Sequence, residues 1–165
     1  MQPQLMTSAK DNWETPPWLF KVLNKIFDFD LDAAASESNK MTPVAFTEDG
    51  YNALVEDWSK HTQNKIVWLN PTYGYATGKF LDKAQKESIN DLTVVCLIAA
   101  RTDTRAFRVV WNYAKYVIFL YGRLKFLLDG KEVGTATFPS AIPIFTDKEW
   151  DLSFMEQYGK IIKLR

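Results

Sequence analysis

The sequence predicts an α/β fold built on a single Rossmann-like, doubly wound sheet that is mostly parallel, with an antiparallel hairpin strand near the C-terminus. Segments with helical and with strand periodicity alternate along most of the chain. The run from Leu92 to Ala99 is almost continuously apolar, as in a strand buried on both faces. A chain of 165 residues, 47% of them hydrophobic, has the size of one globular domain, so residues 1–165 are expected to form one.

The first helix is expected after a polar tail, residues 1–12, which we expect to be mobile. Thr15 stands before two prolines as a helix N-cap would, and apolar residues then recur at helical spacing. From Phe27 to Asp32 the period changes to two, which predicts a strand that ends at Asp32.

The middle of the chain is less regular. Residues 41–57 show only a short strand pattern at 44–46 and a short helix pattern at 52–55. A clear strand at 65–69 then stops at a loop containing proline and glycine. The remaining elements are expected to be helices at 79–88 and 104–116, strands at 92–99 and 116–121, and a hairpin in which a strand at 122–126 turns at 129–130 and returns at 135–145.

Composition limits the function classes. The formal net charge is zero, which disfavours a protein that coats DNA and leaves only local contacts with a nucleic acid. Cys96 and His61 are the only residues of their kinds, so no disulfide, no metal site built on them and no histidine-dependent triad is expected. The N-terminus does not resemble a secretory signal and no apolar run approaches 20 residues, so we expect a cytoplasmic protein.

The loop Asn70-Pro71-Thr72-Tyr73 is the first candidate for chemistry because it follows a buried strand directly. An aromatic amine needs acceptors for its N–H groups while its nitrogen attacks, and the Asn70 carboxamide and the Pro71 carbonyl supply two. Tyr73 offers a ring on which a base can stack after leaving its duplex.

The second and third candidates also follow predicted strands. The segment Asp32-Ala33-Ala34-Ala35-Ser36 combines a carboxylate with small residues that let a ligand approach the backbone. Arg101, Thr102, Asp103 and Arg105 leave the most buried strand and are candidates for DNA contacts. Tyr75, Arg123 and Lys125 join this DNA-binding set, although solvated surface positions explain such cations equally well.

The chain resembles the phage-type DNA N6-adenine methyltransferase (Dam) family. The loop at Asn70 is similar to the (Asn/Asp/Ser)-Pro-Pro-(Tyr/Phe) motif of amino-methyltransferases, with Thr72 in place of the second proline. The resemblance extends from about Trp13 to Phe145 and rests on the order of several short motifs. These motifs are Trp13-x-Thr15-Pro16, Phe29-x-Leu31-Asp32-Ala33-Ala34-Ala35-Ser36, Asn39, Phe46-Thr47, Trp58, Val67-Trp68-Leu69-Asn70-Pro71, Tyr73-Gly74, Lys83-Ala84, Ala100-Arg101-Thr102-Asp103-Thr104 and Gly122-Arg123-Leu124-Lys125-Phe126.

The resemblance implies a class I methyltransferase-like fold, S-adenosylmethionine as the methyl donor, DNA as the partner and no metal. It implies that Asn70, Pro71, Thr72 and Tyr73 form the catalytic loop, with Asn70 also beside the cofactor. The cofactor set that it implies comprises Trp13, Thr15, Pro16, Asp32, Ala33, Ala34, Ala35 and Ser36, with Asp57 as the candidate for the ribose hydroxyls.

Two alternatives stay open at this point. The first is methylation of cytosine N4 or of a base in RNA, because these carry the same kind of amino group. The second is a non-catalytic module that binds DNA, cofactor or a partner, because Thr72 departs from the motif. The chain leaves little room for a separate recognition domain, so we expect sequence selectivity to be weak or to need a homodimer or residues 41–57.

Overall fold

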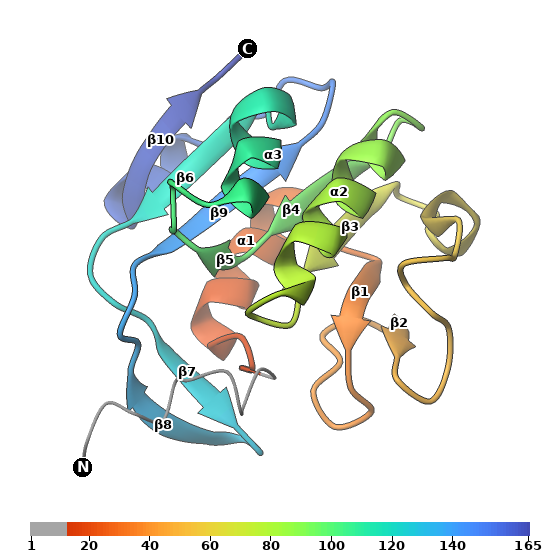
Figure 1. Ribbon diagram of the computed structural model, residues 1–165, viewed down its shortest axis with the longest axis horizontal. Coiled ribbons are helices and arrows are strands. Elements are labelled where there is room, and N and C mark those ends of the chain that lie inside the picture. The colour runs from red at the N-terminus through yellow and green to blue at the C-terminus, as the bar shows by residue number, and fades with distance from the viewer. Residues whose placement is uncertain (1–12) are drawn as a thin grey trace.

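The main sheet of this computed structural model has the strand order β10-β6-β9-β4-β3-β1-β2, and the short β5 pairs with β9 (Figure 1). The structure describes residues 13–165, so the tail expected at 1–12 lies outside the described residues. The neighbours β2, β1, β3 and β4 are parallel, whereas β9 runs antiparallel to both β4 and β6, and β10 antiparallel to β6. The protein is therefore a mixed α/β structure with a mostly parallel central sheet.

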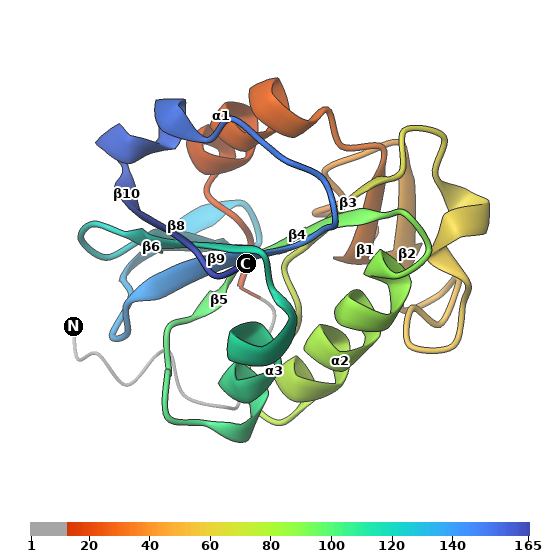
Figure 2. The same ribbon diagram turned by 90° about the horizontal axis from the view of Figure 1, so that it is seen from above.

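Three α-helices within the described residues cover both faces of the sheet: α1 lies on one face, and α2 and α3 lie on the other (Figure 2). None of these helices is long and apolar enough to span a membrane. The elements are α1 (Pro17–Phe27), β1 (Leu31–Ala35), β2 (Val44–Thr47), η2 (Trp58–His61), β3 (Ile66–Leu69), α2 (Ala76–Ser88), β4 (Thr93–Cys96), β5 (Ile98–Ala99), α3 (Arg105–Tyr113), β6 (Tyr116–Leu120), β7 (Lys125–Leu128), β8 (Lys131–Thr135), β9 (Ser140–Phe145), η3 (Ser153–Gln157) and β10 (Gly159–Lys163).

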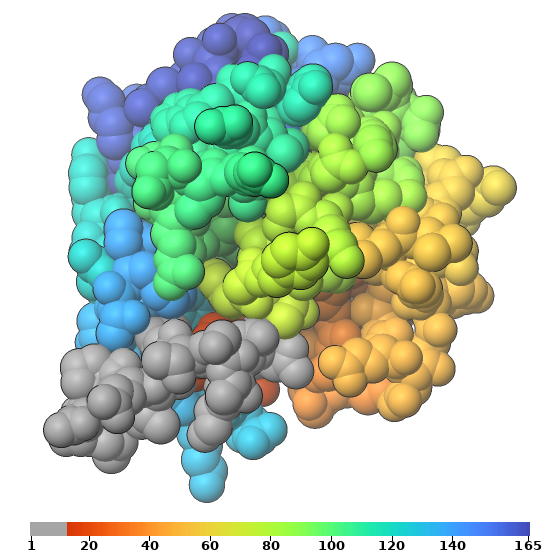
Figure 3. All heavy atoms as spheres, viewed as in Figure 1, coloured from red at the N-terminus to blue at the C-terminus, as the bar shows by residue number. Residues whose placement is uncertain are grey.

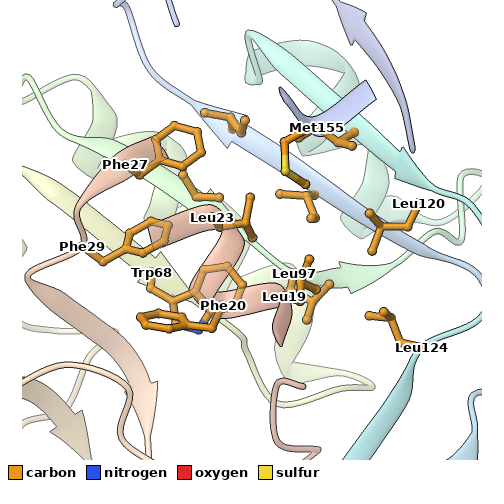
Figure 4. Close-up of a cluster of buried hydrophobic side chains, with 14 of the residues drawn as sticks. Leu19, Phe20, Leu23, Phe27, Phe29, Trp68, Leu97, Leu120, Leu124 and Met155 are labelled. Atoms are coloured by element: carbon orange, nitrogen blue, oxygen red, sulfur yellow. The ribbon is translucent and has the colours of Figure 1, made fainter. Parts of the chain in front are cut away.

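The core has two layers because successive side chains of a strand point to opposite faces of the sheet. In β3, Trp68 belongs to the layer under α1, whereas Val67 and Leu69 belong to the layer under α2 and α3. Figure 4 shows the first layer, where Phe20 of α1 and Phe29 both pack on the indole of Trp68, with ring centroids 5.6 and 5.5 Å from it. The loop after β3 is thus anchored by a strand that is buried on both sides.

The first helix and strand differ from the expectation at their boundaries. Thr15 is not the N-cap: Pro16 takes that position, and the helix runs to Phe27. The strand expected at 27–32 is wrong, because Asp28 has a left-handed φ of 56° and Asn24 accepts from the amides of Asp28 and Phe29, which ends the helix. The strand β1 begins only at Leu31, so Asp32 lies inside it. The apolar alternation came from Phe27 and Phe29 packing under the helix end.

The middle of the chain follows the prediction with small changes. The strand at 44–46 is confirmed as β2, but residues 52–55 form only a turn, in which the amides of Val55 and Glu56 both donate to the Asn52 carbonyl. The helix α2 begins at Ala76, three residues before the expected start, and Thr104 caps α3 through a hydrogen bond from the amide of Phe107. The apolar run 92–99 divides into β4 and β5 at Leu97.

The C-terminal hairpin is the main correction. The turn lies at Asp129-Gly130 as expected, with φ of 53° and 75°, but the strand that returns from it is β8. A two-residue turn with two positive φ values pairs the strands that flank it directly, so β7 and β8 form a separate two-stranded sheet. The strand expected at 135–145 is instead β9, which inserts between β4 and β6.

Candidate active site

A cavity of about 380 Å³ lies where β1, β2 and β3 end, which is the edge at which parallel α/β sheets bind their ligands. It brings Asp32 and Asn70, which are 38 positions apart in the sequence, into one lining. Seen from the side of α2 and α3, the segment that carries β2 lies beside α2 (Figure 3). The lining residues are Trp13, Glu14, Thr15, Asp32, Ala33, Ala34, Ala35, Ser36, Asn39, Met41, Phe46, Thr47, Glu48, Tyr51, Asn52, Ala53, Trp68, Asn70, Pro71, Thr72 and Phe80.

Asn70 is held in one orientation by the start of the described chain. Its Nδ2 donates to the Trp13 carbonyl at 2.8 Å and to Thr15 Oγ1 at 3.0 Å. Because a carbonyl only accepts, the amide nitrogen must face Trp13, and the oxygen is fixed on the other side. That oxygen, Oδ1, is buried and has no hydrogen-bond partner among the residues described. Asn70, which lines the cavity, therefore carries an acceptor oxygen that no described residue uses.

Asp32 is 2% exposed, and its carboxylate accepts from the amides of Met41 at 3.0 Å and Ala34 at 3.3 Å. Burial raises the pKa of Asp32 from 3.8 to about 6, against the smaller lowering effect of the two amide hydrogen bonds. The hydrogen bond from Met41 ties β1 to the segment before β2, whereas the bond from Ala34 lies within β1. Asp32 thus shapes the cavity, and it also places a carboxyl in it whose charged form a nearby cation would stabilise.

The charged residues of the lining are Glu14, Asp32 and Glu48, so residues 13–165 contribute acidic groups and no basic one to the cavity. Three consecutive alanines, Ala33 to Ala35, leave the main chain of β1 accessible. Apolar rings of Phe46, Trp68 and Phe80 complete the wall. An acidic, half-apolar cavity of this size suits a cationic ligand with a flat ring system.

The loop expected to be catalytic, residues 70–73, is only partly in the cavity. Asn70, Pro71 and Thr72 line it, and the Thr72 carbonyl accepts from Thr77 Oγ1 at 3.0 Å, which fixes the loop to the first turn of α2. Tyr73 does not line the cavity: its ring packs on Phe138 and Phe126, with centroids 5.4 and 5.8 Å away.

The Tyr73 hydroxyl is buried without a hydrogen-bond partner among residues 13–165, and burial raises the pKa of Tyr73 far above its usual value. Within the described structure, the ring is therefore packed under the β7–β8 hairpin.

The structure brings most of the expected cofactor set together, with two exceptions. Trp13, Thr15 and the segment from Asp32 to Ser36 line the cavity. Pro16 caps α1 instead and lines a second groove. Asp57 lies outside the cavity, because its carboxylate caps η2, accepts from Ser59 Oγ at 2.6 Å and pairs with Lys60 at 3.5 Å.

Glu48 is one of the lining residues that the sequence did not point to. It follows β2 directly, is exposed, and makes no ion pair within the described part of the chain. An acidic residue at the end of the strand beside β1 is where α/β nucleotide sites accept ribose hydroxyls. The signal was present in the sequence, since Glu48 comes two residues after the strand pattern at 44–46.

The seven residues of the expected DNA-binding set all lie outside the cavity. Tyr75, which is 90% exposed, follows the catalytic loop and has Lys79 over its ring at 5.3 Å. The Arg101 guanidinium lies 5.5 Å from the Phe138 ring, which also contacts Tyr73. Thr102, Asp103 and Arg105 are exposed at the start of α3.

Arg123 and Lys125 line the second groove, together with Trp18. The expected set is therefore divided among the start of α2, the start of α3 and the hairpin. No group of three or more His, Cys, Asp or Glu side chains within residues 13–165 is placed to hold a metal ion.

Two comparisons with known proteins point to the same family. Residues 2–157 match the family described as DNA N-6-adenine-methyltransferase (Dam). The chain is 32% identical over 126 residues to a DNA N-6-adenine-methyltransferase of Escherichia phage T1, and the match covers 76% of this chain. It covers 51% of the phage protein, so the chain spans about half the length of that relative. By the extent of the family match, this chain belongs to the DNA N-6-adenine-methyltransferase (Dam) family.

Proposed function

We propose that this protein transfers the methyl group of S-adenosylmethionine to the N6 amino group of adenine in DNA. The observation that carries the proposal is Asn70, whose amide nitrogen is tied to Trp13 and Thr15 while its buried Oδ1 lacks a partner among the described residues. Membership of the Dam family and the similarity to the phage T1 protein support the reaction and the substrate.

We further propose that the fold is Rossmann-like and of the class I methyltransferase type. Three features support this: the parallel order β2-β1-β3-β4, helices on both faces, and a cavity at the carboxyl ends of the strands. The antiparallel β9 between β4 and β6 is the expected antiparallel strand, although it is not the returning strand of a hairpin.

The acidic cavity fits S-adenosylmethionine, which carries a sulfonium and an ammonium group. Asp32 would hold the cationic end, Ala33 to Ala35 would let the ligand lie against β1, and Glu48 would accept the ribose hydroxyls. When bound, the cofactor supplies an electrophilic methyl group. The burial of Asp32 strengthens its attraction for a cation, because the surroundings screen charge poorly.

Asn70 Oδ1 and the Pro71 carbonyl would accept the two N–H groups of the target amine. These acceptors draw electron density toward the amine nitrogen as it becomes positive, and they are in place before the substrate arrives. The Pro71 carbonyl accepts no hydrogen bond from residues 13–165, so it is available.

For Tyr73 to stack on the base, its ring must leave Phe126 and Phe138. Tyr75, Arg101, Thr102, Asp103, Arg105, Arg123 and Lys125 are proposed to contact the DNA around the target.

Replacing Asn70 with alanine tests the proposal. Asn70→Ala should lower the methylation rate by at least roughly 10²-fold, the cost of losing one preorganised hydrogen-bonding group, while cofactor affinity measured by calorimetry changes little. The exposed Asn112 of α3 supplies the matched control Asn112→Ala, which should methylate at the wild-type rate. Unchanged turnover by Asn70→Ala would reject the role of Asn70.

Analysis of digested DNA by nucleoside mass spectrometry identifies the modified base. N6-methyladenine supports the proposal, and N4-methylcytosine would move the same chemistry to another base. Modified RNA with unmodified DNA would reject DNA as the substrate. Absence of both modification and S-adenosylmethionine binding would support the non-catalytic alternative.

A further inference from the structure

Thr72 is the one position of the catalytic loop at which this chain departs from the motif that it resembles. A proline there has neither an N–H nor a hydroxyl, whereas threonine has both. Thr72 lines the cavity beside Asn70 and Pro71 and is half-buried. Threonine in place of the motif's proline therefore adds an N–H and a hydroxyl to a residue that lines the site.

The added groups are not used by the protein itself. The Thr72 carbonyl accepts from Thr77 Oγ1, which fixes the residue to α2. Within residues 13–165, neither the N–H nor the hydroxyl of Thr72 has a hydrogen-bond partner. A hydroxyl needed only for the loop would be expected to bond to the loop or to α2.

The chemistry of the target base explains what the hydroxyl can do. The N6 amino group of adenine is next to N1, a ring nitrogen that accepts hydrogen bonds, on the edge used in Watson–Crick pairing. Enzymes that act on an extruded base read that edge by hydrogen bonds. Asn70 Oδ1 and the Pro71 carbonyl only accept, so they can hold the amino group but not N1. Thr72, the next residue, carries the donor that is missing from this set.

We propose that Thr72 is a specificity-determining residue whose hydroxyl donates a hydrogen bond to adenine N1 while Asn70 and Pro71 accept from the amino group. This inference rests on the proposed function. The three groups together would contact both the amino group and the ring nitrogen beside it.

The test crosses two variants of the protein with two variants of the base. Duplexes that carry one mapped target adenine are compared with duplexes in which 1-deazaadenine, with a C–H in place of N1, replaces it. For the wild type, replacing adenine with the analogue should lower kcat/KM for two reasons. The first is the intrinsic effect of the analogue, and the second is a further factor of roughly 3 to 10 for the loss of one neutral hydrogen bond. For Thr72→Val, which keeps the shape but lacks the hydroxyl, the further factor should disappear.

The comparison of ratios removes effects that belong to the base alone, such as weaker pairing or altered nucleophilicity, since both proteins experience them equally. Thr72→Ser should retain the further factor, and Thr72→Pro should lose it. In a second control, 7-deazaadenine, which alters the opposite side of the amino group, should give equal ratios for wild type and Thr72→Val. Calorimetry with S-adenosylmethionine checks that Thr72→Val still folds and binds the cofactor.

Equal analogue ratios for wild type and Thr72→Val, with both proteins active on adenine, would overturn the role of Thr72 and leave the proposed function intact. No methylation of any DNA by the wild type would reject the proposed function and this inference with it. A ratio that differs for 7-deazaadenine instead of 1-deazaadenine would also overturn it, because the hydroxyl would then face the other edge of the base.

Discussion

The hydrogen bonds of the Asn70 amide nitrogen hold the side chain in an orientation in which its oxygen meets no donor among the described residues. The Trp13 carbonyl and Thr15 Oγ1 take the two N–H groups, and no described residue reaches Oδ1. A buried acceptor without a partner costs roughly 1–3 kcal/mol, which a ligand with an N–H group recovers when it binds. Binding of such a ligand is therefore favoured, because it gives Asn70 Oδ1 a hydrogen-bond partner.

Asp32 is the residue whose charge depends most on what enters the cavity. Its raised pKa means that the folded protein holds the Asp32 proton more tightly than the unfolded chain does. Without a ligand, the contribution of Asp32 to stability therefore decreases as the pH rises from about 4 through about 6. A bound cation has the opposite effect, because it favours the ionised carboxylate.

The affinity for S-adenosylmethionine should consequently rise with pH between about 5 and 7, as Asp32 loses its proton. Titration calorimetry at several pH values, in buffers with different ionisation enthalpies, measures both the affinity and the released proton. Asp32→Asn should bind more weakly and show little of this dependence. Asp82→Asn, on the outer face of α2, should keep it. Parallel pH curves for wild type and Asp32→Asn would contradict the assignment.

Among the elements, the β7–β8 hairpin and the loop after β3 depend on each other. Tyr73 of the loop packs on Phe126 of β7 and on Phe138, which precedes β9. Its hydroxyl lies in this aromatic environment with no hydrogen-bond partner in the described structure. The aromatic packing stabilises the present position of the Tyr73 ring, whereas burial of a hydroxyl without a hydrogen bond destabilises it.

Tyr73→Phe should therefore raise the free energy of unfolding by about 1 kcal/mol, because it removes a buried polar group that makes no hydrogen bond. Urea denaturation followed by fluorescence measures the change. Tyr113→Phe is the matched control, since Tyr113 is 53% exposed and its hydroxyl remains in water. A loss of stability in Tyr73→Phe would show that the hydroxyl is bonded after all.

On the scale of the whole molecule, a zero net charge has to be reconciled with DNA as the proposed partner. The proposed contacts come from four cations, namely Arg101, Arg105, Arg123 and Lys125, near α3 and the hairpin. Each phosphate neutralised by a cation releases counterions. With four such contacts, a plot of the logarithm of the association constant against the logarithm of the salt concentration should have a slope no steeper than about −4.

Binding to duplex DNA at several salt concentrations measures that slope, for example by fluorescence anisotropy. Lys125→Ala should flatten the slope by about one, whereas Lys160→Ala, an exposed residue of the edge strand β10, should leave it unchanged. An equal effect of the two variants would show that the contacts are not localised at the hairpin.

The sequence predicted the parts of the site that depend on strand ends. Residues 65–69 form β3 and Asp32 lies in β1, so parallel pairing placed Asn70 and Asp32 at one edge. Side-chain direction was not predictable in the same way. Asp57 is used by its own short helix, and Tyr73 turns toward a hairpin more than fifty residues away in sequence. Such contacts depend on packing between distant segments, which local patterns do not record.

The strand β10 shows the same limit on the scale of the sheet. Residues Gly159 to Lys163 have a mixed, half-exposed pattern, and the strand forms because the edge of β6 offers a full ladder of partners. An edge strand is stabilised mainly by main-chain hydrogen bonds, so its sequence gives little sign of it.

Residues 13–15 connect the β7–β8 hairpin to the loop that carries Asn70. Glu14 exchanges main-chain hydrogen bonds with Leu127 of the hairpin at 2.9 and 3.1 Å, while its neighbours Trp13 and Thr15 hold the Asn70 amide. A displacement of the hairpin main chain at Leu127 would therefore also move the two groups that hold the Asn70 amide. If DNA binds at the hairpin as proposed, its binding and the alignment of the amide would be coupled through these three residues.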